Sequence, residues 1–341
     1  MRRVVYSRSG GPEVLSFESD AAIPEPGPGE VRVQLVRSGV NPTDWKSRQG
    51  GKPGEPIQPA RTPNQDGSGI VDAVGTGVRE AWLGLRVWVW EAAHERPFGT
   101  AADYTVVPER NAVLLADPAS FDLGAALGVP YITAHRCLTC GEDMPLRIGP
   151  GALDGRTVLV AGGAGAVGHA AIQLAHWSDA VVIATVSSPA KAQLAGAAGA
   201  DHVIDYKQED VAAAVHKIAP AGVDCIVEVA AAQNGALDAE VLGQSGSVAI
   251  YANNGGDEVT LPIRPLMASN ARCQFVLLYN VPYVAKERAI ADVTAAIVDD
   301  AVGIGAEHGL PVHHFSLEET AQAHRAVEEG IVGKVLIDVI P

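Results

Sequence analysis

The stretch VLVAGGAGAVGHAAIQLA, residues 158–175, decides the fold. A short apolar run leads into a turn with the pattern Gly163-x-Gly165-x-x-Gly168, and an Ala-rich helical segment follows. Such glycines let the backbone approach a ligand closely, and the N-terminus of the next helix offers unpaired N–H groups and partial positive charge. A glycine pattern alone is weak, but here strand, loop and helix all occupy the right places. The stretch therefore predicts the pyrophosphate site of a dinucleotide-binding domain.

Around this loop, apolar strands alternate with Ala-rich helices. The predicted strands are residues 157–163, 181–187, 202–206, 224–230, 246–252 and 273–279. Near-continuous apolar strands of this kind are buried on both faces, as in a doubly wound parallel sheet. We therefore expect an α/β protein in which residues 128–283 form a Rossmann domain that binds NADP(H).

The segments that flank the Rossmann domain have a different pattern. Residues 1–127 contain short Val-rich strands broken by Gly and Pro, which indicates a β-rich, barrel-like domain. The stretch GVNPTDWK, residues 39–46, adds a polar cluster to a strand-like part of it. Residues 284–341 are too few to form a good core alone. We expect them to complete the first domain.

Bulk properties narrow the classes of function. A chain of 341 residues predicts two domains. A formal net charge of −15 opposes delocalised binding to nucleic acid or to an anionic membrane. No apolar run is long enough for a membrane span or a signal peptide, so we expect a cytoplasmic protein without nucleic-acid or membrane partners.

The four cysteines are too few and too irregularly spaced for a disulfide framework, so we interpret them as reduced thiols. Cys137 and Cys140 form a CxxC near His135, which raises zinc or redox chemistry as an alternative. The second Cys/His pair of a zinc site is missing, and the segment has a helical pattern. A structural reading of this CxxC is therefore favoured.

The end of the second Rossmann strand selects the cofactor. An acidic residue there would bind the 2′-hydroxyl of NAD, but the chain reads ATVSSPAKAQ. A 2′-phosphate needs donors and positive charge. We therefore predict NADPH, with Ser187, Lys191 and Tyr206 around the phosphate. The alternative for Lys191 is a solvated lysine on the next helix.

The chain resembles the zinc-free quinone oxidoreductase branch of the medium-chain dehydrogenase/reductase superfamily, the branch that includes zeta-crystallin. The resemblance rests on GGPEVL (10–15), GVNPTD (39–44), DGSGIVDAVGTGV (66–78), ADYTVVPE (102–109), AALGVPYITAHR (125–136), AGGAGAVGHAAIQLA (161–175), GADHVIDY (199–206) and GKVLIDV (333–339). These pieces span nearly the whole chain in the expected order. They are more specific for the family than for the substrate.

The resemblance implies a GroES-like β-barrel catalytic domain, a Rossmann domain, and a cleft between them. It also implies homodimers or homotetramers joined through Rossmann edge strands. The residues that match its cofactor contacts are Thr133, Gly163, Ala164, Gly165, Ala166, Val167, Gly168, Ala252, Asn253, Asn254, Gly255, Val276, Leu277, Leu278 and Lys334.

The resemblance also implies a metal-free enzyme. Zinc-dependent members carry ligands at positions that correspond here to Asn41, the 64–66 segment and Val129. None of these positions offers a thiolate or an imidazole, and catalytic zinc needs three protein ligands. Without a Lewis acid, hydride transfer is best suited to an acceptor whose charge delocalises, such as a quinone or an α,β-unsaturated carbonyl.

The polar residues of the 39–46 stretch are the natural substrate-side donors. We take Asn41, Asp44, Lys46 and Tyr131 as the catalytic candidates, with Tyr279 as an alternative donor. Asn41 and Asp44 could instead only fasten a loop to its backbone. Many quinone reductases have a Tyr where Lys46 stands, which keeps an enone or 2-enoyl-thioester reductase open. A non-catalytic NADPH-binding protein, crystallin-like or RNA-binding, is the third reading, although the acidic charge opposes RNA.

Overall fold

The computed structural model describes residues 1–117 and 119–340, and the chain divides into two compact units. Unit 1 comprises Met1–Val129 and Val312–Pro341, and unit 2 comprises Pro130–Pro311. By sequence, the helix α2 (Phe121–Thr139) runs from unit 1 into unit 2.

This division differs from the predicted domains in the segment 284–311, which groups with unit 2 and does not complete the first domain. The reason is α8 (Tyr283–Val298), whose buried Asp292 accepts hydrogen bonds from the His135 ring, the Arg147 side chain and the Ile148 N–H. These contacts tie α8 to α2 and to the segment that follows α2. Only residues from Val312 onward return to unit 1.

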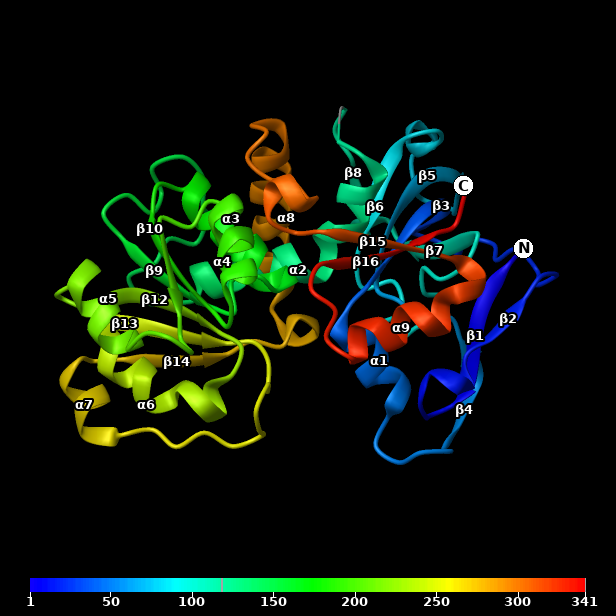
Figure 1. Ribbon diagram of the computed structural model, residues 1–341. Coiled ribbons are helices and arrows are strands. Elements are labelled where there is room, and N and C mark those ends of the chain that lie inside the picture. Colours follow the sequence, from blue (N-terminus) through cyan, green and yellow to red (C-terminus); the bar gives the residue numbers. More distant parts are fainter. Residues whose placement is uncertain (118, 341) are drawn as a thin grey trace. The chain divides into compact units, whose positions relative to one another are not determined.

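The core of unit 2 is a six-stranded parallel sheet with the strand order β11-β10-β9-β12-β13-β14 (Figure 1). Its strands are β9 (Thr157–Ala161), β10 (Val181–Val186), β11 (His202–Asp205), β12 (Val223–Glu228), β13 (Leu242–Ile250) and β14 (Arg272–Phe275). This order defines a doubly wound Rossmann sheet, as predicted. The last strand ends at Phe275, earlier than the sequence pattern suggested.

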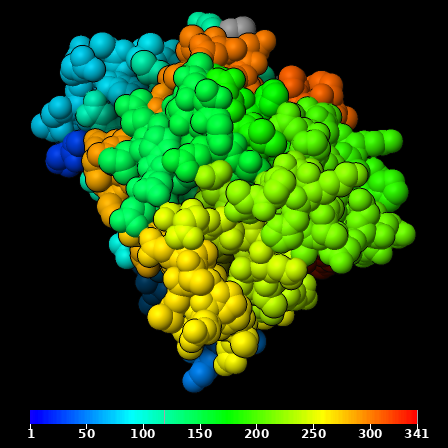
Figure 2. Space-filling view, turned by 90° about the vertical axis from the view of Figure 1, so that its left-hand side faces the viewer, coloured from blue at the N-terminus to red at the C-terminus, as the bar shows by residue number. Residues whose placement is uncertain are grey.

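Helices cover both faces of this sheet. They are α3 (Ala166–Trp177) and α4 (Pro189–Ala197) on one face, and α5 (Val211–Ile218) and α6 (Ala231–Val241) on the other (Figure 1). Apolar side chains of α5 pack on Leu159, Ile183 and Ile226 of the strands. The short helix α7 (Ile263–Ala268) and β14 lie at the surface, in the yellow part of Figure 2.

Unit 1 is rich in antiparallel strands. A seven-stranded sheet has the order β15-β16-β3-β5-β6-β8, with β7 also paired to β3, and a three-stranded sheet has the order β2-β1-β4. The strands are β1 (Arg3–Arg8), β2 (Ser16–Glu18), β3 (Glu30–Val40), β4 (Pro56–Arg61), β5 (Asp66–Val74), β6 (Arg86–Val89), β7 (Tyr104–Pro108), β8 (Ala112–Leu114), β15 (Val312–Ser316) and β16 (Lys334–Asp338). Val33, Leu35, Val71 and Val87 lie in its core.

The C-terminal strand is what completes unit 1. β16 pairs with β3 in antiparallel register, with Leu336 opposite Gly39, and the helix α9 (Thr320–Glu328) precedes it. The predicted final strand is therefore confirmed. Over the described residues, no helix combines the length and the apolar character that crossing a bilayer requires.

The stretch 39–46 is strand-like only in its first two residues. β3 ends at Val40, Asn41 is an N-cap residue, and the helix α1 (Pro42–Gln49) follows. Pro42 suits the first helical position because a missing N–H costs nothing there. The Asn41 N–H donates to Asp44 Oδ2 at 2.7 Å, which satisfies one backbone donor at the helix entrance. The polar cluster therefore starts a helix.

Candidate functional site

The glycine loop follows β9, beside the point where the strand order of the sheet reverses. The packing around the loop requires glycine at positions 163 and 168. A Cβ on Gly163 would lie 2.9 Å from Ala184 Cβ, and one on Gly168 would lie 2.4 Å from the Gly162 carbonyl oxygen. Both distances are too short for a side chain, so these two glycines let strand and helix meet closely.

Gly165 is different, because the fold leaves room beside it. A Cβ there would have the Gly162 carbonyl oxygen, 3.4 Å away, as its nearest neighbour, and the residue is exposed. Gly165 is the N-cap residue of α3. Ala166 and Val167, the first helical residues, are half-buried, while Ala164 is buried. The open space therefore faces the N-terminus of α3, where an anionic pyrophosphate binds in this class of loop.

Three predicted phosphate ligands gather at the carboxyl ends of β10 and β11. Lys191 Nζ donates to Ser187 Oγ at 3.1 Å. The Tyr206 N–H donates to the Val186 carbonyl at 3.0 Å, which places Tyr206 next to the end of β10, and its side chain is 52% exposed. One ammonium and two hydroxyls at this corner provide donors that a 2′-phosphate could accept.

The other predicted cofactor segments reach the same edge of the sheet. The Val276 N–H donates to the Ile250 carbonyl at 2.8 Å, so the segments after β13 and β14 leave the sheet side by side. Asn253, Asn254, Gly255 and Leu277 are exposed, Ala252 is half-buried, and Val276 and Leu278 are buried. The carboxyl edge of a parallel sheet is where ligands bind in such folds.

Two predicted residues on α2 are buried in unit 2. Thr133 is 5% exposed. Tyr131 has no exposed surface, and its hydroxyl donates to Gln173 Oε1 at 2.6 Å while its ring meets His169 edge-on. The phenol is therefore hydrogen-bonded within the core of unit 2, and contact of Tyr131 with a substrate stays a prediction.

A buried polar cluster in unit 1 joins Asn41, Asp66 and Lys334. Asn41 Nδ2 donates to Asp66 Oδ2 at 2.7 Å, and Lys334 Nζ donates to Asn41 Oδ1 at 2.7 Å. Asp66 also accepts the Val129 N–H at 2.9 Å. Asn41 and Lys334 are 2% and 1% exposed, and Asp66 is fully buried. The three side chains thus form a hydrogen-bonded unit shielded from solvent.

Asp44 adds a second carboxyl to the cluster. It accepts the Asn41 and Gln65 N–H groups at 2.7 and 3.1 Å. Burial, reinforced by the charge of Asp66, raises the pKa of Asp44 to about 8. Burial likewise raises the pKa of Asp66 to about 6 against the opposing Lys334 ammonium, and lowers the pKa of Lys334. Removing Lys334 or Asp66 would leave the other as a buried charge without its partner.

A zinc ion does not fit this donor set. Asn41, Asp66 and Val129 do come together, but their polar atoms bond to one another and to an ammonium. Within residues 1–117 and 119–340, no group of three or more His, Cys, Asp or Glu side chains could hold a metal ion.

Lys46 is set apart from this buried cluster. It is exposed on α1, and its Nζ lies 5.8 Å from the centroid of the Trp45 ring. Its predicted contact with substrate stays a prediction. Asp66, by contrast, is a residue that sequence reasoning missed as a participant. The available signal was a carboxylate at the start of a strand of small and apolar residues, DGSGIV.

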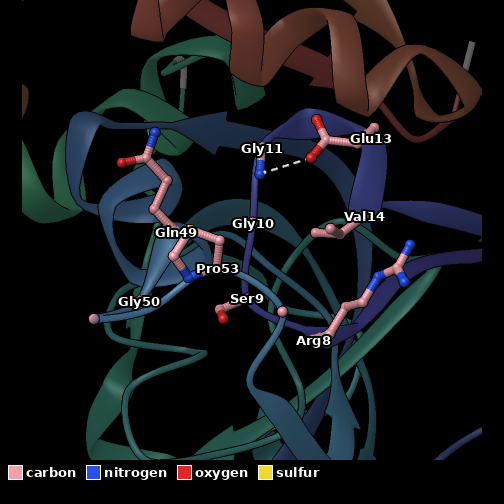
Figure 3. A pocket seen from close by; sticks show the side chains of 11 residues that line it. Arg8, Ser9, Gly10, Gly11, Glu13, Val14, Gln49, Gly50 and Pro53 are labelled. Carbon is pink, nitrogen blue, oxygen red and sulfur yellow. Dashed lines mark hydrogen bonds between the residues drawn. The ribbon is translucent and has the colours of Figure 1, made fainter.

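Unit 1 also contains a hollow of about 570 Å³ between residues 8–14 and 49–54 (Figure 3). Glycines supply much of its wall, and Figure 3 labels Arg8, Glu13 and Gln49 around it. Gly11 N–H donates to Glu13 Oε1 at 3.0 Å at its rim. None of the predicted site residues lines this hollow.

These features define a class. A six-stranded Rossmann sheet with an open glycine loop, together with a β-rich unit completed by the C-terminal strand, is the architecture of the alcohol dehydrogenase type. Residues 27–117 match the family described as "Alcohol dehydrogenase GroES-like domain", and residues 166–295 match "Zinc-binding dehydrogenase".

Comparisons with individual proteins narrow the class. The chain is 31% identical to "Quinone oxidoreductase" of Lama guanicoe, with 99% of this chain and 97% of that protein covered. A solved "NAD-dependent alcohol dehydrogenase" is similar at 29% identity and a TM-score of 0.84 over 100% of both chains. A mycobacterial protein complexed with NADPH is similar at 26% identity and a TM-score of 0.82, over 99% of this chain and 100% of that one. The chain belongs to the quinone oxidoreductase branch of the medium-chain dehydrogenase/reductase superfamily.

Proposed function

We propose that the chain is an NADPH-dependent, zinc-independent oxidoreductase that reduces a quinone. The observation that carries the proposal is the carboxyl edge of the unit 2 sheet, where Gly165 has open space beside it and Lys191 pairs with Ser187. These two places suit the pyrophosphate and the 2′-phosphate of the cofactor. The names of the relatives supply the acceptor and the cofactor. When bound, the reduced nicotinamide supplies the hydride. Rates with quinone, enone and enoyl-thioester acceptors test the proposal.

Different segments of the chain then bind different parts of the cofactor. The N–H groups at the start of α3 hold the pyrophosphate, and Lys191, Ser187 and Tyr206 hold the 2′-phosphate. The segments 252–255 and 276–278, with Thr133, line the nicotinamide side. Lys334 was predicted to contact the cofactor, and its bonds to Asn41 and Val40 favour a structural role instead.

Lys191→Ala tests the choice of cofactor, on which the named relatives differ. A charge-assisted hydrogen bond is worth about 1.5–3 kcal/mol, so we expect the KM for NADPH to rise roughly 10–100-fold. The KM for NADH should change little, because NADH has no 2′-phosphate. Steady-state kinetics with both cofactors provide the measurement, and Lys207→Ala, on the loop after β11, is the matched control. An equal effect on both cofactors would remove Lys191 from the phosphate site.

The donor set supports zinc independence. Asn41 and Asp66 are held by each other and by Lys334, and a strongly bound metal would have to displace these bonds. Hydride transfer to a quinone gives an anion that spreads over the ring, so positioning and hydrogen-bond donors suffice. Full activity after dialysis against a chelator is the expected result.

An enone or 2-enoyl-thioester reductase is the second candidate. It is favoured by Lys46, an exposed cation on α1 where the resembled family commonly has a tyrosine. A lysine can donate to a carbonyl oxygen, and Asn41 and Asp44 are less suited to this because their polar atoms are buried. If the chain is an enone reductase, Lys46→Ala should strongly lower kcat with an enone and leave the Kd for NADPH nearly unchanged. A non-catalytic protein would bind NADPH and oxidise it with none of the acceptors.

We propose that two copies of the chain associate through β14. This strand is the edge of the unit 2 sheet, and all four of its residues are exposed. Large apolar side chains accompany it: Ile263, Met267 and Phe275 are 75%, 74% and 64% exposed. An uncovered edge strand with apolar neighbours is a template for pairing with another strand.

Phe275→Lys should therefore produce a smaller species than the unmodified chain in light scattering at matched concentration. The introduced charges would face each other across a self-paired edge. Val298→Lys is the control, because Val298 is 68% exposed on α8 and should leave the mass unchanged. A monomeric unmodified chain would contradict the proposal.

We also propose a cytoplasmic location, which is consistent with the few, irregularly spaced cysteines. Cell fractionation tests it.

A further inference from the structure

Three of the four cysteines meet at one place in unit 2. Cys137 lies in α2, Cys140 directly follows that helix, and Cys225 lies in β12. The Sγ atoms of Cys140 and Cys225 each lie 3.5 Å from the same atom, the carbonyl oxygen of Cys137. The two sulfurs are therefore separated by at most twice that distance, although they come from distant parts of the sequence.

A second contact brings the same two segments together. A Cβ added to Gly141, the residue after Cys140, would lie 2.7 Å from Ser247 Oγ. Ser247 is the residue of β13 that pairs with Cys225 in the sheet. The backbone that carries Cys140 therefore packs directly on the pair of strands that holds Cys225. The absence of a side chain at position 141 is what allows this close approach.

The three thiols differ in their access to solvent. Cys137 and Cys225 have no exposed surface, whereas Cys140 is half-buried. Burial raises the pKa of all three thiols, and the Arg136 guanidinium opposes this effect at Cys137 and Cys140. The Asp224 carboxylate, next to Cys225 in the sequence, raises the pKa of that thiol further. Cys140 is thus the thiol that a soluble oxidant can reach first.

We propose that Cys140 and Cys225 form an oxidisable dithiol that closes to a disulfide joining the end of α2 to β12. A hydroperoxide oxidises the Cys140 thiol to a sulfenic acid and leaves as water or an alcohol. The Cys225 sulfur then attacks the Cys140 sulfur, the S–S bond forms, and a second water leaves with the Cys225 proton. Two thiols lose two electrons in total, and the hydroperoxide gains them.

Closure requires a local movement of Cys140. A disulfide places its sulfurs about 2.05 Å apart and its Cβ atoms about 3.5–4.5 Å apart, so the Cys140 Sγ must turn from the Cys137 carbonyl toward β12, with the backbone at Cys140 adjusting to bring its Cβ into that range. Cys140 lies beyond the last residue of α2, Thr139, and the residues that follow it form a turn at the surface. Its reorientation therefore breaks no helix. Cys225 can remain in its place in the sheet.

The experiment is a thiol count on the folded full-length chain after treatment with hydrogen peroxide. Cys273 is exposed and could link two chains, so a Cys273→Ser background removes it. Of its three thiols, two should be lost, and peptide mapping without reduction should identify the Cys140–Cys225 link. The oxidised protein should also unfold several degrees higher, because a cross-link restricts the unfolded chain.

Two further variants in the same background separate the possible outcomes. With Cys137→Ser, the loss of two thiols and the temperature shift should persist. With Cys140→Ser, neither should occur. A Cys137–Cys140 link in the map, retention of all three thiols, or over-oxidation of Cys140 without a cross-link would each overturn the proposal. The count and the map are independent of catalysis, so they are unaffected if the proposed quinone reduction fails.

Discussion

Gly165→Val is expected to weaken NADPH binding by roughly 100-fold or more while the thermal unfolding temperature stays nearly unchanged. The reason is that the fold leaves space at this position, with the nearest neighbour of a Cβ 3.4 Å away. A branched side chain would fill the region in front of α3 that the pyrophosphate must enter. Titration of NADPH fluorescence against the variant gives the dissociation constant, and calorimetry gives the unfolding temperature.

The matched control is Gly168→Val, in the same loop. A Cβ at position 168 would lie 2.4 Å from the Gly162 carbonyl oxygen, so this variant should lose stability as well as binding. The contrast separates a glycine required by the ligand from one required by the fold. Unimpaired NADPH binding by Gly165→Val would contradict the assignment of the loop as the pyrophosphate site.

Lys334→Met is expected to cost about 3–5 kcal/mol of the free energy of unfolding, the usual penalty for leaving a buried charge without its partner. The Lys334 ammonium bonds to Asn41, which in turn holds Asp66, and its charge opposes that of the Asp66 carboxylate. Urea denaturation at neutral pH measures the loss. Lys52→Met, at an exposed position in the same unit, should have little effect.

The double variant Lys334→Met with Asp66→Asn should recover part of that loss. Its asparagine can still accept the Val129 N–H, and one uncompensated carboxylate is gone. Recovery identifies charge, and not packing, as the source of the penalty. If the single variant loses less than about 1 kcal/mol, a value typical of exposed ion pairs, the cluster is not an ionic unit.

The elements of the fold with strong local signals were predictable from sequence. The central Rossmann strands are near-continuous apolar runs, and they were found in place because such runs suit strands buried on both faces. The edge strand β14 is the exception, because its residues are exposed and it ends at Phe275. The glycine loop was predictable for a similar reason, since its strand, turn and helix are consecutive. At α1, however, a Val-rich strand obscured the start of a helix, although Asn41, Pro42 and Asp44 are helix-entry residues.

Features that depend on distant partners were not predictable. The segment 284–311 was assigned to the wrong unit because Asp292 takes its donors from His135 and Arg147, more than a hundred residues earlier. The hydroxyl of Tyr131 donates to Gln173, a contact that only the packing of two helices decides. Asn41, the 64–66 segment and Val129 were named together only as positions that lack a zinc ligand, and the direct bonds of Asp66 to Asn41 and Val129 depend on contacts between separate elements.

Quinone reduction by NADPH is tested by the rate at which the purified chain oxidises the cofactor with benzoquinone, phenanthrenequinone, a simple enone and crotonyl-CoA. Each acceptor is run with NADPH and with NADH, against a blank without protein, after removal of metal ions by a chelator. We expect a quinone to oxidise NADPH fastest and NADH to be the poorer donor. A preference for NADH, activity only with the enone or crotonyl-CoA, or no oxidation despite NADPH binding would contradict this expectation.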